Sequence, residues 1–263
     1  MKLLTQADDF GFTRAVTYGI IDSIDLGIVR NTGLFANMPS APFAVSFMKD
    51  RPHVCFGIDF NYVSGPCCAD PKLIPHLVDE NGNLIRSSLR VRDPRFQSEE
   101  GRYEMLPLDE MYIELKAQYD RFVELTGQKP GYLHVHSLPV EPYIETIRRI
   151  SKETGVIFSQ DAIDQYDIAM WLKDHQGSMA KVANMSAMMQ YDPWVDINRN
   201  KEYMLSHEYA MLGGHAGYVD ADLMKLSSLS LERFKDAEML MSDEIKQWIK
   251  ENDIELITYS DLK

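Results

Sequence analysis

Short apolar segments, which favour strands, alternate along this chain with longer segments whose apolar residues recur at helical spacing. Residues 54–60 form a compact apolar run, typical of a strand buried on both faces of a parallel sheet. Residues 15–26 place Ile20, Ile21 and Ile24 on one helical face, and Gly27 follows at a position where helices commonly end. The pattern predicts strands at 3–7, 29–36, 54–60, 132–136, 156–158, 209–212 and 254–259, and helices at 15–26, 41–48, 111–125, 142–154 and 232–251.

The repeated strand–helix units show no break in composition, which indicates a single α/β domain over residues 1–263 with a parallel sheet, either barrel-like or doubly wound. One connection, residues 63–106, is long and rich in Pro, Gly, Asp and Arg, with a turn expected at 79–83. Connections of this length within a compact domain are usually functional, so we expect it on the substrate side. In both architectures, functional side chains collect at the carboxyl ends of the strands.

The net charge is −13, from 27 lysines and arginines against 40 aspartates and glutamates. This balance disfavours nucleic acid and anionic membranes as partners, and it favours a neutral or cationic small substrate. No apolar stretch approaches the roughly 18–20 residues that a membrane helix needs, and the N-terminus becomes acidic too early for a signal peptide. We therefore expect a cytoplasmic protein. Cys55, Cys67 and Cys68 have no regular spacing, so reduced thiols are expected rather than disulfides or a zinc knuckle.

Two adjacent carboxylates, Asp8 and Asp9, end the first predicted strand and are followed by Gly11. Neighbouring side chains at a strand end point in different directions, so the pair is suited to two separate jobs. One carboxylate could hold a metal ion while the other accepts a proton from water. The alternative is structural, because Asp is also favoured at helix N-caps, where it satisfies free backbone N–H groups.

Nitrogen and oxygen ligands are predicted at the ends of two further strands. Asp59 lies near the end of the third predicted strand, with Asn61 on the same face two residues later. His134 and His136 occupy alternate positions of the next strand, so both rings face one side. With the carboxylates they form a mixed set that suits Zn²⁺, Mn²⁺ or a similar divalent ion. The alternative is a pair of buried core histidines with hydrogen-bonded partners.

A further histidine, His215, lies in the glycine-rich run Gly213-Gly214-His215-Ala216-Gly217-Tyr218, directly after an apolar strand. The flanking glycines leave its ring accessible, so it could donate a proton to a leaving group or stabilise an oxyanion. A glycine-rich turn in which the histidine caps a local group explains the pattern equally well. The remaining histidines, which are expected to be exposed, are His53, His76, His175 and His207.

Taken together, these motifs resemble the YdjC/ChbG family of carbohydrate deacetylases from end to end. Ala7-Asp8-Asp9-Phe10-Gly11 resembles the family's Asn-Ala-Asp-Asp-Phe-Gly, and Ala36-Asn37-Met38-Pro39 resembles its Val-Asn-Met-Pro. Gly19-Ile20-Ile21 and Gly27-Ile28-Val29-Arg30-Asn31-Thr32 are similar to its Gly-Ile-Ile and Gly-Ile-Val-Thr-Ser-Thr. Similarity extends to Leu77-Val78-Asp79-Glu80-Asn81-Gly82, to His215-Ala216-Gly217-Tyr218 and to Ile257-Thr258-Tyr259-Ser260-Asp261-Leu262.

The resemblance implies a (β/α) barrel, regular or distorted and incomplete, related to the NodB-type polysaccharide deacetylases. It implies a hydrolase that removes an acetyl group from a chitobiose-like carbohydrate, with Mg²⁺, Zn²⁺ or Mn²⁺ as cofactor. A homodimer is compatible with the sequence. Carried over to this chain, Asp8 is the general base, Asp9 is a metal ligand and His215 is the candidate acid. Substrate-binding residues are expected at Asn37, Asn61, Arg86 and Tyr218.

This chain departs from the family pattern at two positions. Where the family has Gly-Leu-His-Leu-Asn, with a histidine ligand, this chain has Gly57-Ile58-Asp59-Phe60-Asn61. Where the family has His-Leu-Asp-Ser-His, it has Tyr132-Leu133-His134-Val135-His136. If the exchanged residues face each other across the site, the charge and number of ligands are conserved. We therefore expect the metal ion to be held by Asp9, His136 and one of Asp59 or His134.

Two other functions stay open. Arginines of the 63–106 connection could grip a phosphate, which would suit a phospho-disaccharide hydrolase, although such residues mostly stay solvated or ion-paired at the surface. A sugar-binding or regulatory protein that has lost turnover is the non-enzymatic alternative. Acetate release from chitobiose or its phosphate would separate an enzyme from a binding module. The arginines concerned are Arg86, Arg90, Arg92, Arg95 and Arg102.

Overall fold

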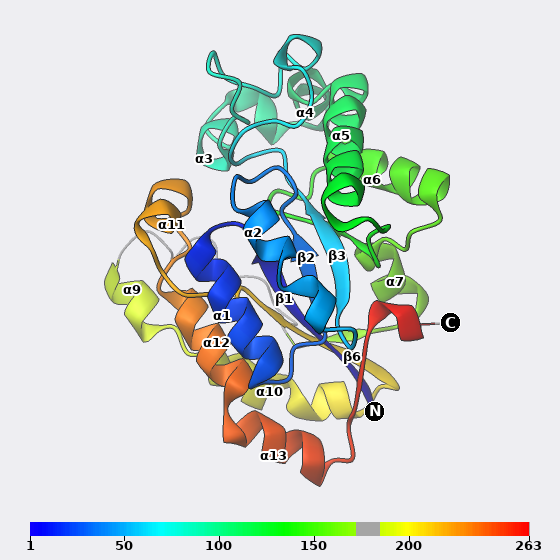
Figure 1. Ribbon diagram of the computed structural model, residues 1–263, viewed down its shortest axis with the longest axis vertical. Helices are drawn as coiled ribbons and strands as arrows, with labels where there is room; N and C mark the ends of the chain where they lie inside the picture. Colours follow the sequence, from blue (N-terminus) through cyan, green and yellow to red (C-terminus); the bar gives the residue numbers. More distant parts are fainter. Residues whose placement is uncertain (172–184, 263) are drawn as a thin grey trace.

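A parallel sheet runs through the centre of the molecule, with helices around it (Figure 1). The computed structural model describes residues 1–171 and 185–262, so His175 lies outside the described residues. The strands are β1 (Lys2–Phe10), β2 (Asn31–Leu34), β3 (Cys55–Phe60), β4 (Leu133–Val135), β5 (Ala169–Met170), β6 (Tyr209–Gly214) and β7 (Glu255–Ile257).

Strand β1 lies at the centre of the sheet, whose order is β4-β3-β2-β1-β6-β5, with β7 also paired to β1. Strand β2 pairs with the second half of β1, whereas β7 pairs with residues 2–4, so the C-terminal strand lies beside the N-terminal one. Within the described residues, β4 and β5 end the path without pairing to each other, which leaves the sheet open. The expected incomplete α/β barrel is confirmed.

Helices cover the sheet in pairs. Helix α1 packs on β1 and α12, α5 packs on β3 and α6, and α10 packs on β5, β6 and α12. None of the helices in the described part of the chain is both long and apolar enough to cross a membrane. The helices are α1 (Arg14–Asp25), α2 (Ala41–Val45), α3 (Ser87–Arg90), α4 (Glu99–Met105), α5 (Leu108–Thr126), α6 (Glu141–Thr154), α7 (Ser159–Gln165), α9 (Met185–Gln190), α10 (Pro193–Leu205), α11 (Ala221–Leu226), α12 (Glu232–Met241) and α13 (Asp243–Glu251).

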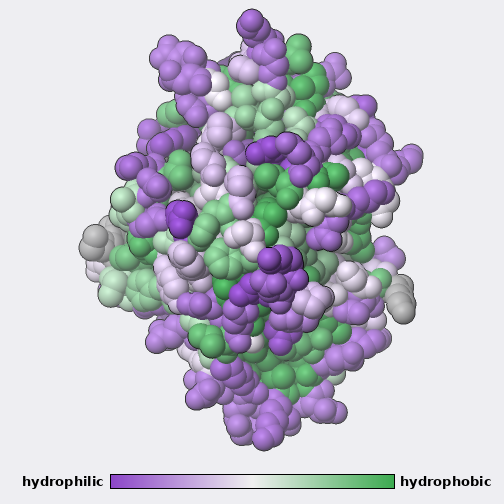
Figure 2. Space-filling view, in the orientation of Figure 1, coloured by the Kyte–Doolittle hydropathy of each residue, from purple (hydrophilic) through white to green (hydrophobic). Residues whose placement is uncertain are grey.

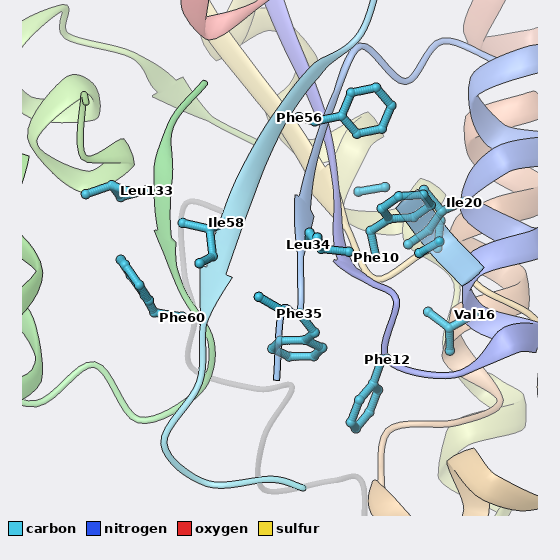
Figure 3. Close-up of a cluster of buried hydrophobic side chains, with 14 of the residues drawn as sticks. Phe10, Phe12, Val16, Ile20, Leu34, Phe35, Phe56, Ile58, Phe60 and Leu133 are labelled. Atoms are coloured by element: carbon cyan, nitrogen blue, oxygen red, sulfur yellow. The ribbon is translucent and has the colours of Figure 1, made fainter. Parts of the chain in front are cut away.

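Apolar side chains of the first strands fill the space between the sheet and α1 (Figure 3). Phe10 of β1 and Leu34 of β2 lie near Val16 and Ile20 of α1, and all four side chains are fully buried. Burying a side chain of this size stabilises the fold by about 1.5–3 kcal/mol. On the face shown in Figure 2, hydrophilic residues predominate and hydrophobic residues form scattered patches. The apolar face predicted for residues 15–26 is therefore the face of α1 that packs against the sheet.

Local signals explain several helix boundaries. Thr13 caps α1, because its hydroxyl accepts a hydrogen bond from the backbone N–H of Val16. Helices α5 and α6 end at Gly127 and Gly155, both with φ of 72° in the left-handed region that glycine adopts without strain. Gly27 follows α1 as expected, and a side chain there would collide with the Leu240 carbonyl oxygen at 2.5 Å.

Four expected elements differ from the structure. The strand predicted at 29–36 is confined to β2, and the helix predicted at 41–48 ends as α2 at Val45, followed by a 3-10 turn at Met48–Asp50. Residues 156–158 form a single bridge between Phe158 and Leu133 rather than a strand. The helix predicted at 232–251 is two helices, because Ser242 adopts an extended conformation and caps α13.

The 63–106 connection carries short helices of its own. Besides α3 and α4 it contains 3-10 turns at Pro71–Leu73 and Pro94–Gln97. The turn expected at 79–83 is confirmed, since the Asp79 carboxylate accepts hydrogen bonds from the backbone N–H groups of Asn81 and Asn83. Arg90 is buried beneath this segment and donates to the carbonyl oxygens of Leu77 and Met105. The 63–106 connection therefore has regular secondary structure and hydrogen bonds of its own within the domain.

Candidate active site

The paired carboxylates Asp8 and Asp9 point to opposite sides of the end of β1, as the alternation of a strand predicts. Neither caps the following helix, because Thr13 holds that position. Asp9 has a φ of 74°, a left-handed conformation that Asp tolerates better than most residues. Its backbone N–H donates to the Asp59 carboxylate at 2.7 Å, which holds this turn in place. The two carboxylates therefore belong to two separate clusters of side chains.

The first cluster, which we call the ligand cluster, consists of Asp8, Asp59 and His134. One potential ligand atom from each residue lies within 4.8 Å of the other two. Asp59 and His134 are paired across β3 and β4, so two neighbouring strand ends present them together. The exchanged family positions therefore do lie beside each other. Carboxylate oxygen and imidazole nitrogen are suitable ligands for zinc, and this set leaves coordination positions for water and substrate.

The ligand cluster holds two carboxyl groups and contains no lysine or arginine to balance their charge. Asp59 is 1% exposed, and its Oδ1 atom has no hydrogen-bond partner among the described residues. Burial, together with the charges of Asp8 and Asp9, raises the pKa of Asp59 well above its usual value. Burial lowers the pKa of His134, which favours the neutral ring that binds metals. An orphaned carboxylate oxygen beside a second carboxylate and a neutral histidine is the environment that a divalent cation would satisfy.

The strand next to Asp59 leaves room for its carboxylate only because residue 33 is glycine. A Cβ atom built on Gly33 would lie 1.8 Å from Oδ1 and 2.3 Å from Cγ of Asp59. Both distances are far below van der Waals contact, so any larger residue would displace the carboxylate. Gly33 is thus part of the site although it carries no functional group.

The second cluster, the proton cluster, consists of Asp9, His136 and Arg233. Asp9 Oδ2 accepts a hydrogen bond from the Arg233 guanidinium at 2.6 Å, and Asp9 Oδ1 lies 3.0 Å from Nδ1 of His136. Burial alone would raise the pKa of Asp9, but the charges of Arg233 and His136 outweigh it and hold that pKa well below its usual range. Asp9 is therefore a buried, ionised carboxylate. Its Oδ1 atom makes no hydrogen bond within the described residues although His136 Nδ1 lies 3.0 Å away, and the His136 ring packs edge-on against Phe35.

His215 lies directly after β6, where its backbone N–H donates to Oδ2 of Asp236 at 2.9 Å. The other oxygen of Asp236 accepts from the Tyr191 hydroxyl at 2.7 Å. Burial raises the pKa of Asp236, and the charge of His215 acts against this rise. His215 also lies close enough to Asp9 to lower its pKa. The histidine is half-buried and held at the edge of the proton cluster by α12.

The residues expected to bind sugar are spread over the structure. The amide groups of Asn37 and Asn61 are buried and bond to each other and to the Ser64 carbonyl oxygen. Hydrogen bonding to Asp22 raises the pKa of Tyr218 to about 12 and ties its hydroxyl to α1. Arg86 donates to a carbonyl oxygen of α11. The observed contacts of these four side chains are thus structural, and their binding of sugar stays a prediction.

The arginines of the 63–106 connection do not converge on a shared position. Arg92 is exposed, and the others bond to partners within the protein. These contacts give no support to a phosphate grip. The partners are the Lys225 carbonyl oxygen for Arg86, the Leu77 and Met105 carbonyl oxygens for Arg90, Asp93 for Arg95, and Glu141 for Arg102.

Other predicted side-chain states are mostly confirmed. Cys55, Cys67 and Cys68 are free thiols. His53 and His76 are exposed as expected, whereas His207 is half-buried against Tyr203.

Helix α12 supplies two residues of the site that the sequence analysis missed, Arg233 and Asp236. Both share a helical face with Ala237 and Leu240, so charged residues at positions of an apolar stripe were the available signal.

Comparisons with known proteins identify the family of this chain. The sequence model of the YdjC-like protein family matches residues 2–251. Carbohydrate deacetylase 2 of Listeria innocua is 32% identical over 267 residues, which cover 100% of this chain and 99% of that protein. Chitooligosaccharide deacetylase of Proteus mirabilis is 27% identical over 269 residues, covering 99% of this chain and 98% of that protein.

One solved structure shows the same fold over nearly its whole length. It is an Enterococcus faecalis protein described provisionally as a cellobiose-phosphate cleavage protein. Its TM-score is 0.77 at 21% identity, and the match covers 99% of this chain and 98% of that one. The family match, the relative at 32% identity and the shared fold all span the chain. This chain belongs to the YdjC-like protein family.

Proposed function

We propose that this protein is a metal-dependent carbohydrate deacetylase that removes the acetyl group from an N-acetylated sugar. Family membership supports the reaction class, and relatives named carbohydrate deacetylase and chitooligosaccharide deacetylase align over their full lengths. The observation that carries the proposal is the ligand cluster, in which a buried carboxylate oxygen of Asp59 has no hydrogen-bond partner within the described part of the chain. Asp8, Asp59 and His134 would hold a divalent ion there.

The two carboxylates of β1 then divide the work in the reverse order from that implied by the family resemblance. Asp8 faces Asp59 and His134, whereas both oxygens of Asp9 face Arg233 and His136. A fully buried carboxylate paired with a guanidinium is a weak base, so Asp9 is suited to orienting a partner. Its partner is His136, whose Nε2 atom stays available for proton transfer because Nδ1 faces Asp9.

The reaction is hydrolysis of an amide. A divalent ion in the ligand cluster would polarise the acetyl carbonyl group and make a water molecule more acidic. His136 accepts the proton from the attacking water through Nε2, because its Nδ1 atom faces Asp9. His215 donates a proton to the departing nitrogen as the carbon–nitrogen bond breaks, which yields acetate and the free amine. General acid–base groups of this kind each contribute about 10²–10⁴-fold to rate.

The test measures acetate release from N,N′-diacetylchitobiose and from its phosphate, after chelator treatment and after addition of Zn²⁺, Mn²⁺ or Mg²⁺. We expect release only with metal. We expect Asp8→Asn to lose metal affinity and turnover together, and His136→Gln to keep metal affinity while turnover falls at least about 100-fold. His53→Gln, at an exposed histidine, is the matched control and leaves both unchanged.

Three results would change or refine the proposal. Full metal affinity in Asp8→Asn with loss of turnover would restore the roles implied by the resemblance, with Asp8 as the base. No acetate from either substrate with any of the three metals would contradict deacetylation and leave sugar binding as the function. Release from the phosphorylated substrate alone would identify the phosphate as part of the recognised group.

A further inference from the structure

The turn that follows His136 has an unusual backbone. Ser137 and Leu138 have φ values of 55° and 42°, which lie in the left-handed region that side chains disfavour. Within the described residues, no other pair of adjacent non-glycine residues shares this conformation. It is unfavourable for a residue as bulky as leucine, so contacts from outside the turn must hold it in place.

One such contact comes from Tyr62, which lies two residues after β3. Its hydroxyl donates a hydrogen bond to the Leu138 carbonyl oxygen at 2.8 Å. The same oxygen accepts a bond from the backbone N–H of Val140 at 2.8 Å, so both of its lone pairs are used. Tyr62 is 0% exposed, and solvent therefore does not compete for its bond to Leu138.

The Tyr62 ring is itself held by residues of two helices. The ring of Tyr143 in α6 packs against it with centroids 4.6 Å apart. The guanidinium of Arg90 in α3 lies over the Tyr62 ring, 5.5 Å from its centroid. Tyr143 and Arg90 are both buried. Packing therefore sets the direction of the Tyr62 hydroxyl, and the 63–106 connection contributes to it through Arg90.

The backbone on the other side of His136 is also fixed. The His136 N–H donates to the Phe60 carbonyl oxygen and to the Tyr143 hydroxyl oxygen, each at 3.1 Å. The Tyr143 hydroxyl donates in turn to the Phe60 carbonyl oxygen. The end of β3 thus holds the chain at His136, and Tyr62 holds it two residues later.

We propose that Tyr62 is a positioning residue that keeps the Ser137–Leu138 turn left-handed and thereby orients the His136 ring for proton transfer. The inference rests on the proposed function, in which His136 accepts a proton from water. A displacement of about 1 Å in such a group can cost on the order of 100-fold in rate. The edge-on contact between the rings of His136 and Phe35, whose centroids are 4.6 Å apart, reports the orientation directly.

Three substitutions separate the hydroxyl from the turn. Tyr62→Phe removes the bond to the Leu138 carbonyl oxygen and keeps the packed ring. Tyr132→Phe is the matched control, because its hydroxyl is equally buried but has no hydrogen-bond partner among the described residues. Ser137→Gly makes the turn less dependent on Tyr62, since glycine adopts the left-handed conformation without strain. It should therefore compensate in part for Tyr62→Phe.

The first readout is the contact between the rings of His136 and Phe35 in metal-free protein, measured from nuclear Overhauser effects. We expect the wild-type intensity in Tyr132→Phe and a weaker one in Tyr62→Phe. The second readout is acetate release from N,N′-diacetylchitobiose with the most effective of the three metals. In Tyr62→Phe we expect kcat to fall about 10–100-fold. KM and metal affinity should stay unchanged, because His136 lies outside the ligand cluster. Adding Ser137→Gly should restore part of kcat.

The outcomes separate this inference from the proposed function. A purely structural role of Tyr62 would lower the urea midpoint but leave kcat and the ring contact unchanged, and that result would overturn the inference. Equal losses of kcat in Tyr62→Phe and Tyr132→Phe would overturn it as well. No acetate release by the wild type would refute the proposed function alone. A weaker ring contact in Tyr62→Phe would then still support the positioning role, because that contact is measured without metal or substrate.

Discussion

The buried ion pair between Arg233 and Asp9 gives the sharpest prediction about stability. The two side chains are 1% and 0% exposed, and the charged atoms are 2.6 Å apart. Arg233→Met would leave the Asp9 carboxylate buried without its guanidinium partner, with His136 and His215 as its remaining favourable neighbours. Removing one partner of a buried pair costs about 3–5 kcal/mol, because an uncompensated charge stays in a medium of low dielectric constant. We therefore expect the free energy of unfolding to fall by that amount at neutral pH.

The loss should depend on pH in a definite direction. In the wild type the pKa of Asp9 is below its usual value, so the pair stabilises the fold above the unfolded pKa of about 3.9. That contribution is lost as the pH falls toward the folded pKa. In Arg233→Met the buried carboxylate has no guanidinium, so its pKa rises and it becomes protonated at a higher pH. The difference between wild type and variant should therefore shrink as the pH is lowered from 7 toward 4.

Urea unfolding monitored by tryptophan fluorescence measures these free energies, and a double-mutant cycle isolates the pair. The double variant Asp9→Asn with Arg233→Met should be destabilised by clearly less than the sum of the single changes. Arg95→Met, which breaks the exposed pair with Asp93, is the matched control and should barely move the transition. A loss below about 1 kcal/mol for Arg233→Met, or additive single effects, would refute the reasoning.

Three further predictions follow from local geometry. Gly33→Ala should reduce the affinity for Zn²⁺, measured by calorimetry, more than about tenfold. The added Cβ atom would lie 1.8 Å from Asp59 Oδ1 and displace the carboxylate. An affinity of the variant equal to that of the wild type would contradict this. Burial raises the pKa of the Cys68 thiol to about 12. Its alkylation by iodoacetamide should therefore be slow at pH 8 in folded protein and accelerate with rising pH. Rapid labelling of Cys68 at pH 8 would contradict this prediction. Ser242→Ala should lower the free energy of unfolding by about 1 kcal/mol, since the hydroxyl caps α13, and an unchanged urea midpoint would refute that role.

The sequence was sufficient to locate much of the candidate site. Parallel strands place their carboxyl ends along one edge of a sheet, so the carboxylates and histidines that end β1, β3 and β4 could be expected to meet. The metal ligands expected from the sequence were Asp9, His136 and one of Asp59 or His134, whereas the ligand cluster contains Asp8 in place of Asp9 and His136. Strand alternation also predicted that Asp8 and Asp9 would face different groups. It could not predict which carboxylate joins which histidine, because that depends on the turn at Asp9 and its bond to Asp59.

The local sequence pattern could not predict which residues of the site α12 would contact. Apolar periodicity continues across Ser242, so the break between α12 and α13 was not visible. Arg233 occupies a position of the apolar stripe of α12, but that position does not reveal its partner, because the packing of α12 against α1 brings it to Asp9. The hydrogen bond from the Tyr259 hydroxyl to Gln6 could not be predicted either, because the pairing of β7 with β1 brings together residues that lie 253 positions apart.

The central claim is that Asp8, Asp59 and His134 hold a divalent ion. Crystals of the protein soaked with Zn²⁺ and measured at the zinc absorption edge would locate the ion by anomalous scattering. We predict a single strong peak at about 2.0–2.2 Å from a carboxylate oxygen of Asp8, Oδ1 of Asp59 and Nε2 of His134. A peak bound instead by Asp9 and His136, with Arg233 displaced, or no peak at this edge of the sheet, would contradict it.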